Sequence, residues 1–196
     1  LHETWGSNNT LSGDLGSWSL TSTADTSASF GGGPGSPPDG SYRNGWDGYG
    51  NISLTSPSMD LTDYALRSRG YPSDSQTVTD TRVMVTAWVF SESADNASED
   101  LEFWVSGDNG STWNLVYRDA SNEDTGTHRG WVQMKADISA YIQKGTNTKI
   151  RFKSTGGGGG DRYGVGKIFI HESPIPTQIG HLGFHHNEIR LGAVPI

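Results

Sequence analysis

The chain has 196 residues, with 14 Lys+Arg against 22 Asp+Glu and a formal net charge of −8. That length fits one globular domain or two small ones. The acidic balance argues against nucleic acid as a partner, because proteins that bind phosphate backbones present a basic patch or stripe. No apolar run approaches the about 20 residues of a bilayer-spanning helix, so membrane insertion is not expected.

The rest of the composition points to short strands. The absence of cysteine excludes disulfides, thiolate nucleophiles and Cys-based metal sites, and it favours a bacterial or phage source. There are 27 Gly, 8 Pro and 7 Trp, while only 18% of residues are charged. Many turn-forming residues and few charges indicate an all-β protein.

The first 80 residues predict loops with sparse apolar anchors. Residues 30–40 are rich in Gly and Pro and predict a surface loop, because proline removes a ladder donor. Residues 51–56 alternate polar and apolar side chains and predict a strand. Residues 81–90 form the most apolar run and predict a strand covered on both faces.

The second half of the chain repeats the strand signal. Residues 101–105 and 113–117 flank Asp108-Asn-Gly110, which predicts a hairpin. Residues 131–134 and 150–153 form a second strand pair, separated by a short helical turn or bend at 137–142. A run of glycines at 156–160 precedes the last core strand at 165–170.

This pattern predicts an all-β fold, an antiparallel two-sheet jelly-roll sandwich over residues 1–173. Residues 174–196 are predicted to be a linker and docking tail with a short β appendage. Its unpaired apolar strand edges predict binding to other protein chains by strand addition. The predicted docking residues are Leu182, Phe184, Ile189, Leu191, Val194 and Ile196.

Several short segments follow one another in a recognisable order: Gly40-Ser-Tyr42, Leu54-Thr-Ser-Pro57, Met59-Asp-Leu61, the apolar strand near Val83, the Asp108-Asn-Gly110 hairpin, Gly130-Trp-Val132, Asp137-Ile-Ser-Ala-Tyr141, Ile150-Arg-Phe152 and a closing Gly-rich loop. This order resembles the MAM-like, concanavalin-like β-jelly rolls, including the cleaved-adhesin modules of secreted bacterial peptidases. The resemblance implies a non-catalytic domain that binds glycans or protein surfaces, or that packs beside a larger assembly.

The same resemblance implies a family calcium site, whose ligand candidates in this chain are Glu3, in the first strand, and Asp161. Because the family's acidic pair is missing here, no cofactor or metal is predicted. Lys167 stands near the position of the family's acidic pair, and an ammonium supplies no ligand oxygen. Two alternatives follow: Lys167 replaces the cation and pairs with Glu3, or it is a solvated side chain.

Residues 106–113 fit the Asp-box pattern of sialidase-like propellers. The Asp and hydroxyl side chains can bond backbone N–H groups across a tight turn, which Trp113 would cover. A propeller needs repeats of about 40–50 residues, and only one copy is present. The pattern therefore predicts a well-formed hairpin.

The best candidate for a sugar site is the loop at 42–49. Aromatic faces stack on the C–H surfaces of a sugar ring, while polar groups bind its hydroxyls. Alternatively, Trp46 and Tyr49 fold inward and cap the core. The carbohydrate-binding candidates are Tyr42, Asn44, Trp46, Asp47 and Tyr49.

Other ionisable clusters are weaker candidates. The acidic residues at 95–100 and 119–124 lack the spacing of a recognised calcium loop and are interpreted as solvated charge. His181, His185 and His186 suggest zinc, but the flanking glycines disfavour the helix such a site needs. No nucleophile elbow is present, and no catalytic residue is predicted.

These observations predict a non-catalytic module that binds carbohydrate or a host surface. The alternative is a structural component of a virion or surface assembly, anchored by its tail, which is similar to short β-repeats of phage virion proteins. A glycan-active enzyme is the third hypothesis. The expected location is extracellular or on a virion surface.

Overall fold

The computed structural model describes residues 1–5, 11–21, 37–41, 43–47, 51–62, 81–92, 99–119, 130–143, 146–155 and 161–174. Several predicted features lie outside these residues: Tyr42 and Tyr49, most of both acidic clusters, the three histidines and the docking tail after residue 174. Within the described residues, no helix is long and apolar enough to cross a membrane.

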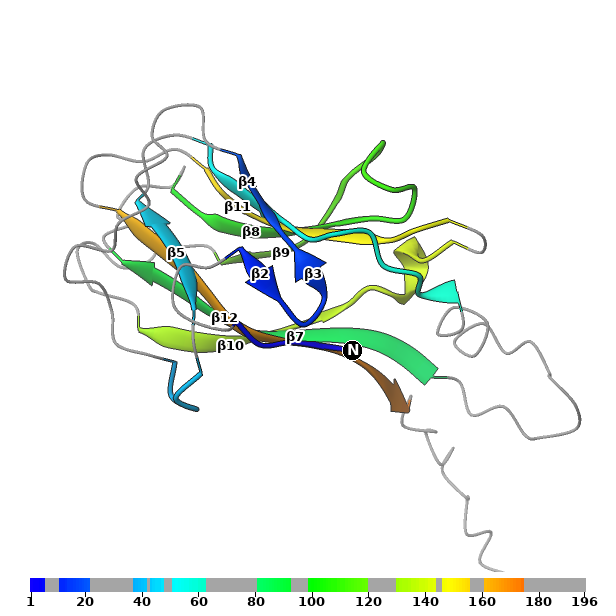
Figure 1. Ribbon diagram of the computed structural model, residues 1–196, viewed down its shortest axis with the longest axis horizontal. Helices are drawn as coiled ribbons and strands as arrows, with labels where there is room; N and C mark the ends of the chain where they lie inside the picture. Colours follow the sequence, from blue (N-terminus) through cyan, green and yellow to red (C-terminus); the bar gives the residue numbers. More distant parts are fainter. Residues whose placement is uncertain are drawn as a thin grey trace, which may run out of the picture.

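The described chain folds into two antiparallel β-sheets packed face to face (Figure 1). The all-β sandwich predicted from the sequence is confirmed. We name each layer after a central strand, the β7 sheet and the β8 sheet. A separate short hairpin pairs β2 (Ser12–Gly13) with β3 (Gly16–Ser17).

The β7 sheet has the order β1-β12-β7-β10, with β5 also paired to β12. Its strands are β1 (His2–Glu3), β5 (Asn44–Asp47), β7 (Thr81–Glu92), β10 (Trp131–Asp137) and β12 (Arg162–Pro174). The register of β12 on β7 shifts between Val165 and Ile168. β5 and β1 pair with β12 on either side of this irregularity.

The β8 sheet has the order β4-β6-β11-β8-β9. Its strands are β4 (Ser19–Thr21), β6 (Ser53–Thr55), β8 (Leu101–Ser106), β9 (Asn114–Asp119) and β11 (Lys149–Ser154). The predicted hairpin is confirmed as β8–β9, with a register shift between Phe103 and Trp104. A 3₁₀ turn, η1 (Ser139–Tyr141), confirms the predicted helical turn.

The second predicted strand pair separates into the two layers. β10 pairs with β7, whereas β11 pairs with β6 and β8. From β6 to β12 the chain changes sheet at every connection except β8–β9, as in a jelly roll. Each strand thereby places its apolar face in the shared interior instead of on its neighbour in sequence.

The core lies between the sheets because alternate side chains of each strand point inward. Val85 and Val89 of β7 belong to the same buried cluster as Phe103 of β8 and Phe152 of β11. The Phe103 and Phe152 rings are 5.1 Å apart and tilted by 45°. Because successive side chains of a strand point to opposite faces, fixing the inward-facing set also fixes which residues point outward.

Candidate binding surface on the outer face of the β8 sheet

Alternation along two neighbouring strands places an unusual set of side chains on the outer face of the β8 sheet. In β8, Leu101, Phe103 and Val105 face the core, and Trp104 lies on the opposite face, partly exposed. In β11, Ile150 and Phe152 are buried. Their neighbours Lys149, Arg151 and Lys153 therefore share the outer face and are partly exposed.

One row of this face crosses four strands through Arg151. Arg151 pairs in register with Thr55 of β6 on one side and with Trp104 of β8 on the other. Trp104 pairs in turn with Leu115 of β9, whose side chain is 38% exposed. We call Thr55, Arg151, Trp104 and Leu115 the Arg151 row. It combines a cation, a hydroxyl and apolar surface.

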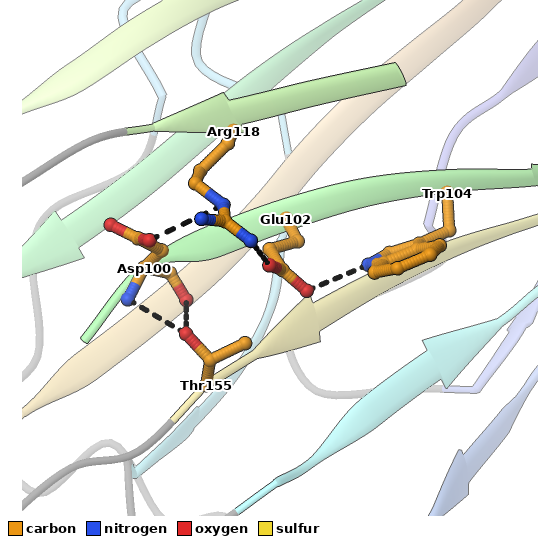
Figure 2. Close-up of polar contacts among 5 residues, drawn as sticks. All are labelled: Asp100, Glu102, Trp104, Arg118 and Thr155. Atoms are coloured by element: carbon orange, nitrogen blue, oxygen red, sulfur yellow. Dashed lines mark hydrogen bonds and ion pairs between the residues drawn. The ribbon is translucent and has the colours of Figure 1, made fainter. Parts of the chain in front are cut away.

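Trp104 is held by its indole N–H, which donates to Glu102 Oε2 at 2.8 Å (Figure 2). The ammonium of Lys153 lies 6.0 Å from the Trp104 ring centroid. The ring therefore has no unsatisfied polar group, and part of its surface meets solvent. A fixed, partly exposed aromatic ring is suited to stacking on a ligand.

Trp113 is positioned by the turn between β8 and β9. Asp108 accepts hydrogen bonds from Thr112 Oγ1 at 2.6 Å, from Thr112 N at 2.8 Å and from Ser106 Oγ at 2.7 Å. These bonds lower the pKa of Asp108 to about 2, chiefly through Thr112. The indole N–H of Trp113 donates to Gly110 O at 3.0 Å. The turn forms as the Asp-box pattern predicts, with Trp113 against it.

The guanidinium of Arg151 stacks on Trp113, with Cζ 3.7 Å from the ring centroid. Its Nε donates to Thr55 Oγ1 at 3.2 Å. Burial lowers the pKa of Arg151, but arginine remains charged at neutral pH. Two contacts thus fix the guanidinium on the sheet face while its terminal nitrogens are left for other partners.

Beside this row lies a cluster of buried acids and one arginine (Figure 2). Arg118 of β9 binds Glu102 Oε1 at 2.5 Å and lies 3.4 Å from Asp100 Oδ2. The two carboxylate side chains are 3% and 6% exposed, whereas that of Arg118 is 49% exposed. Thr155 binds the backbone of Asp100. The arginine therefore compensates the charge of two carboxylates that are removed from water.

The predicted sugar-binding loop is placed differently. Trp46 of β5 is 0% exposed, stacks on Tyr163 and donates from Nε1 to Ser154 Oγ of β11 at 3.1 Å. The prediction of Trp46 as a sugar-stacking surface residue is wrong, because its ring connects the two sheets inside the core. Asn44 is also buried. Asp47 pairs in register with Arg162, and Tyr42 and Tyr49 lie outside the described residues.

Glu3, the first residue considered for calcium, is a buried hydrogen-bond acceptor within the fold. Glu3 is 0% exposed and accepts N–H bonds from Asp14 at 2.7 Å, Leu15 at 3.1 Å and Trp18 Nε1 at 2.7 Å. A carboxylate surrounded by donors does not fit a calcium ligand. Within the described residues, no three His, Asp or Glu side chains gather as a metal site requires. Asp161, the second candidate, is buried.

The predicted Lys167–Glu3 pair is also wrong. Glu3 is opposite Ile168, which faces the core, so the preceding Lys167 points away from it. The ammonium of Lys167 instead lies 4.7 Å from the ring centroid of Phe169. Asp39 supplies a nearby negative charge. Burial raises the pKa of its carboxyl, but hydrogen bonds from Ser41 and then the charge of Lys167 lower that pKa overall.

Trp104, Arg151 and Lys153 are not among the site residues predicted from the sequence. The sequence feature that could have identified them is the alternation of side chains along a strand. Cations recur at 149, 151 and 153, and a tryptophan stands at 104 between apolar neighbours. Their common face becomes apparent only when β11 is placed beside β8.

The fold is that of an antiparallel β-sandwich. No family model and no curated protein matches the chain. Among solved structures, the chain is similar to two cleaved adhesin domains of Lys-gingipain from Porphyromonas gingivalis. One is 15% identical, with 79% of this chain and 89% of that chain covered and a TM-score of 0.49. The other is 16% identical, with 87% and 97% covered and a TM-score of 0.49.

A third similar structure is a xylanase from Cellvibrio japonicus in complex with xylopentaose. It is 14% identical, with 86% of this chain but only 28% of that chain covered, and the TM-score is 0.45. The cleaved adhesin domains belong to the group that the segment order resembles. The resemblances to MAM domains and to virion tails stay predictions.

Proposed function

We propose that this domain is a non-catalytic module of an extracellular surface, and that it binds carbohydrate on the outer face of the β8 sheet. The observation that carries the proposal is the pair of partly exposed rings, Trp104 and Trp113, that adjoin Arg151. Both indole N–H groups are already bonded within the protein, so the rings have fixed orientations.

The chemistry of this face suits a sugar. The C–H surface of a pyranose packs on an aromatic ring, and its hydroxyls need donors and acceptors near that ring. The Arg151 row and the flanking Lys149 and Lys153 supply such groups. Because the rings and the guanidinium are already ordered, binding costs less side-chain entropy than it would on a flexible loop.

The test is a glycan array probed with the full chain and with Trp104→Ala and Trp113→Ala. We expect each substitution to weaken binding about tenfold or more, as for an aromatic residue central to an interface. Trp131→Ala is the matched control, because Trp131 is a partly exposed tryptophan packed on Phe90 in the other sheet. It should leave binding unchanged.

Three outcomes would contradict the proposal. Loss of binding in Trp131→Ala alone would show that the site lies on the β7 sheet. Loss in Tyr42→Ala or Tyr49→Ala, with Trp104→Ala unaffected, would return it to the predicted loop. An array without any bound glycan would exclude carbohydrate and favour the alternative function as an assembly component anchored by residues 174–196.

A further inference from the structure

Resting on the proposed carbohydrate function, we propose that the ligand is an acidic glycan, and that a sugar carboxylate binds the terminal nitrogens of Arg151. Its Nε is bonded to Thr55, and Trp113 covers one face of the guanidinium. Within the described residues, Nη1 and Nη2 have no protein partner, and neither is among the buried unsatisfied atoms.

These two nitrogens form one edge of a planar fork. A carboxylate bonds such an edge through both oxygens at once, and this charge-assisted geometry is stronger than a neutral hydrogen bond. The stack on Trp113 and the bond to Thr55 hold the fork in place. The guanidinium therefore loses little conformational freedom when a carboxylate binds.

The two lysines beside Arg151 extend the positive charge along β11. Lys149 and Lys153 lie two residues away on the same face, and the rise is about 3.4 Å per residue. Within the part of the chain that the structure describes, none of the three cations forms an ion pair. A strand with three uncompensated cations stands out in a chain of net charge −8.

Arg118 shows the contrasting case on the same face. Its guanidinium is paired with Asp100 and Glu102, so its charge is compensated within the fold. Among the described residues, Arg151 contacts a tryptophan and a threonine and forms no ion pair with a carboxylate. The structure therefore separates an arginine that neutralises buried acids from one that is fixed but available to an external anion.

The two tryptophan rings favour an acidic sugar over other anions. A polyanion bound by charge alone needs no aromatic platform, whereas a sugar ring bearing a carboxylate needs both features together. Trp104 lies next to Arg151 in the register and can support the ring whose carboxylate reaches the guanidinium. Charge complementarity and the platform thus favour a polymer of uronic acids.

The experiment compares acidic glycans with neutral copies of themselves. The full chain is titrated calorimetrically with polygalacturonate, alginate and hyaluronan, and with the methyl ester of each. We expect at least one acid to bind about tenfold or more tightly than its ester. Arg151→Gln should remove this difference, and Arg151→Lys should restore only part of it because the fork is lost. Lys135→Gln, an exposed cation in the other sheet, should change nothing.

Each other outcome has a definite meaning. Equal binding of acid and ester, or binding of neutral glycans alone, overturns this inference and leaves the carbohydrate function standing. No binding of any glycan overturns both. If dextran sulfate or a single-stranded oligonucleotide binds as tightly as the best uronate, and Arg151→Lys behaves as wild type, the face is a general polyanion site and the carboxylate assignment fails.

A folding control keeps the test valid. The urea midpoint of Arg151→Gln is measured beside that of the parent chain. If that variant does not fold, Arg151→Lys replaces it, because lysine keeps the charge and lacks the planar fork. Retention of the full preference for acid over ester in Arg151→Lys would then contradict the inference.

Discussion

Trp46 and Trp113 have similar surroundings in the sequence and opposite positions in the structure. Trp46 follows Asn44 and Gly45, and Trp113 follows an Asp-Asn-Gly turn. Both indole N–H groups are bonded, to Ser154 Oγ and to Gly110 O. Yet Trp46 is fully buried between the sheets, whereas Trp113 is partly exposed beneath a guanidinium.

The difference shows that the loop composition does not decide the role of an aromatic residue. Trp46 belongs to a strand whose partner, β12, fixes the direction of its side chain toward the core. Trp113 follows a turn that is closed by its own hydrogen bonds. We therefore expect Trp46 to contribute stability and Trp113 to contribute binding. Four predictions compare the core with the outer face of the β8 sheet, in order of expected effect.

The largest effect is expected for Trp46→Ala. Truncating a fully buried tryptophan leaves a cavity and removes its contact with Tyr163, which should lower the free energy of unfolding by about 3–5 kcal/mol. Urea denaturation measures this loss. Trp131→Ala is the control and should cost less, since that ring is partly exposed. If Trp46→Ala lowers the free energy of unfolding by less than about 1 kcal/mol, Trp46 is not a core residue.

Arg118→Gln should have the next largest effect, because it leaves the buried carboxylates of Asp100 and Glu102 without their cation. The expected loss of stability is about 1–3 kcal/mol. This lies between an exposed ion pair, about 0–1 kcal/mol, and a broken buried pair, about 3–5 kcal/mol, because Arg118 is half exposed.

A double-mutant cycle with Glu102→Gln distinguishes pairing from packing in that cluster. If the ion pair is responsible, the double variant should be more stable than the sum of the two single losses predicts. Strict additivity would show that Arg118 stabilises the sheet through its alkyl chain alone.

A smaller coupling is expected between Arg151 and Trp113. Their stacked contact should contribute about 0.5–1 kcal/mol, as cation–π pairs near a surface do. The cycle uses Arg151→Gln and Trp113→Leu with chemical denaturation. Zero coupling would mean that the guanidinium is not held on the ring and that Arg151 is not a preorganised carboxylate site.

The smallest effect concerns the pH dependence of the turn that positions Trp113. The pKa of Asp108 is lowered from 3.8 to about 2 by its bonds to Thr112 and Ser106. Between these values the unfolded chain binds more protons than the folded one. The contribution of Asp108 is therefore fully present above its ordinary pKa and is lost as the pH falls through about 2.

An NMR titration should place the Asp108 midpoint near 2. Asp108→Asn should remove this residue's share of the acid dependence of stability, with Asp137→Asn as a control in another turn. A midpoint at the ordinary value of 3.8 would show that the turn bonds are not maintained in solution.

The features predicted correctly depend on residues close together in the chain. The β8–β9 hairpin forms around Asp108-Asn-Gly110, where Asn109 has a φ of 61° and Gly110 a φ of 96°. Asn and Gly tolerate this left-handed region better than other residues, so the local sequence favours the turn. The 3₁₀ turn after β10 was predicted for the same reason, from a short local pattern.

The candidate site could be predicted only in its parts. The alternation of cations in β11 shows that Lys149, Arg151 and Lys153 share a face, but it does not reveal which strand lies beside them. For Glu3, the residue itself was selected from the sequence, but its partners could not be predicted. A lone acidic residue in a first strand gave no sign that the β2–β3 hairpin and Trp18 would supply its three N–H donors.

The sequence by itself determined that the chain forms short strands and one tightly bonded hairpin, because turn chemistry and side-chain alternation act over a few residues. Only the tertiary structure decided which tryptophan became core and which became surface. That choice depends on the pairing of β5 with β12 and of β11 with β8, contacts between residues about 120 and about 50 positions apart. Long-range pairing sets the direction of a side chain, and direction sets its function.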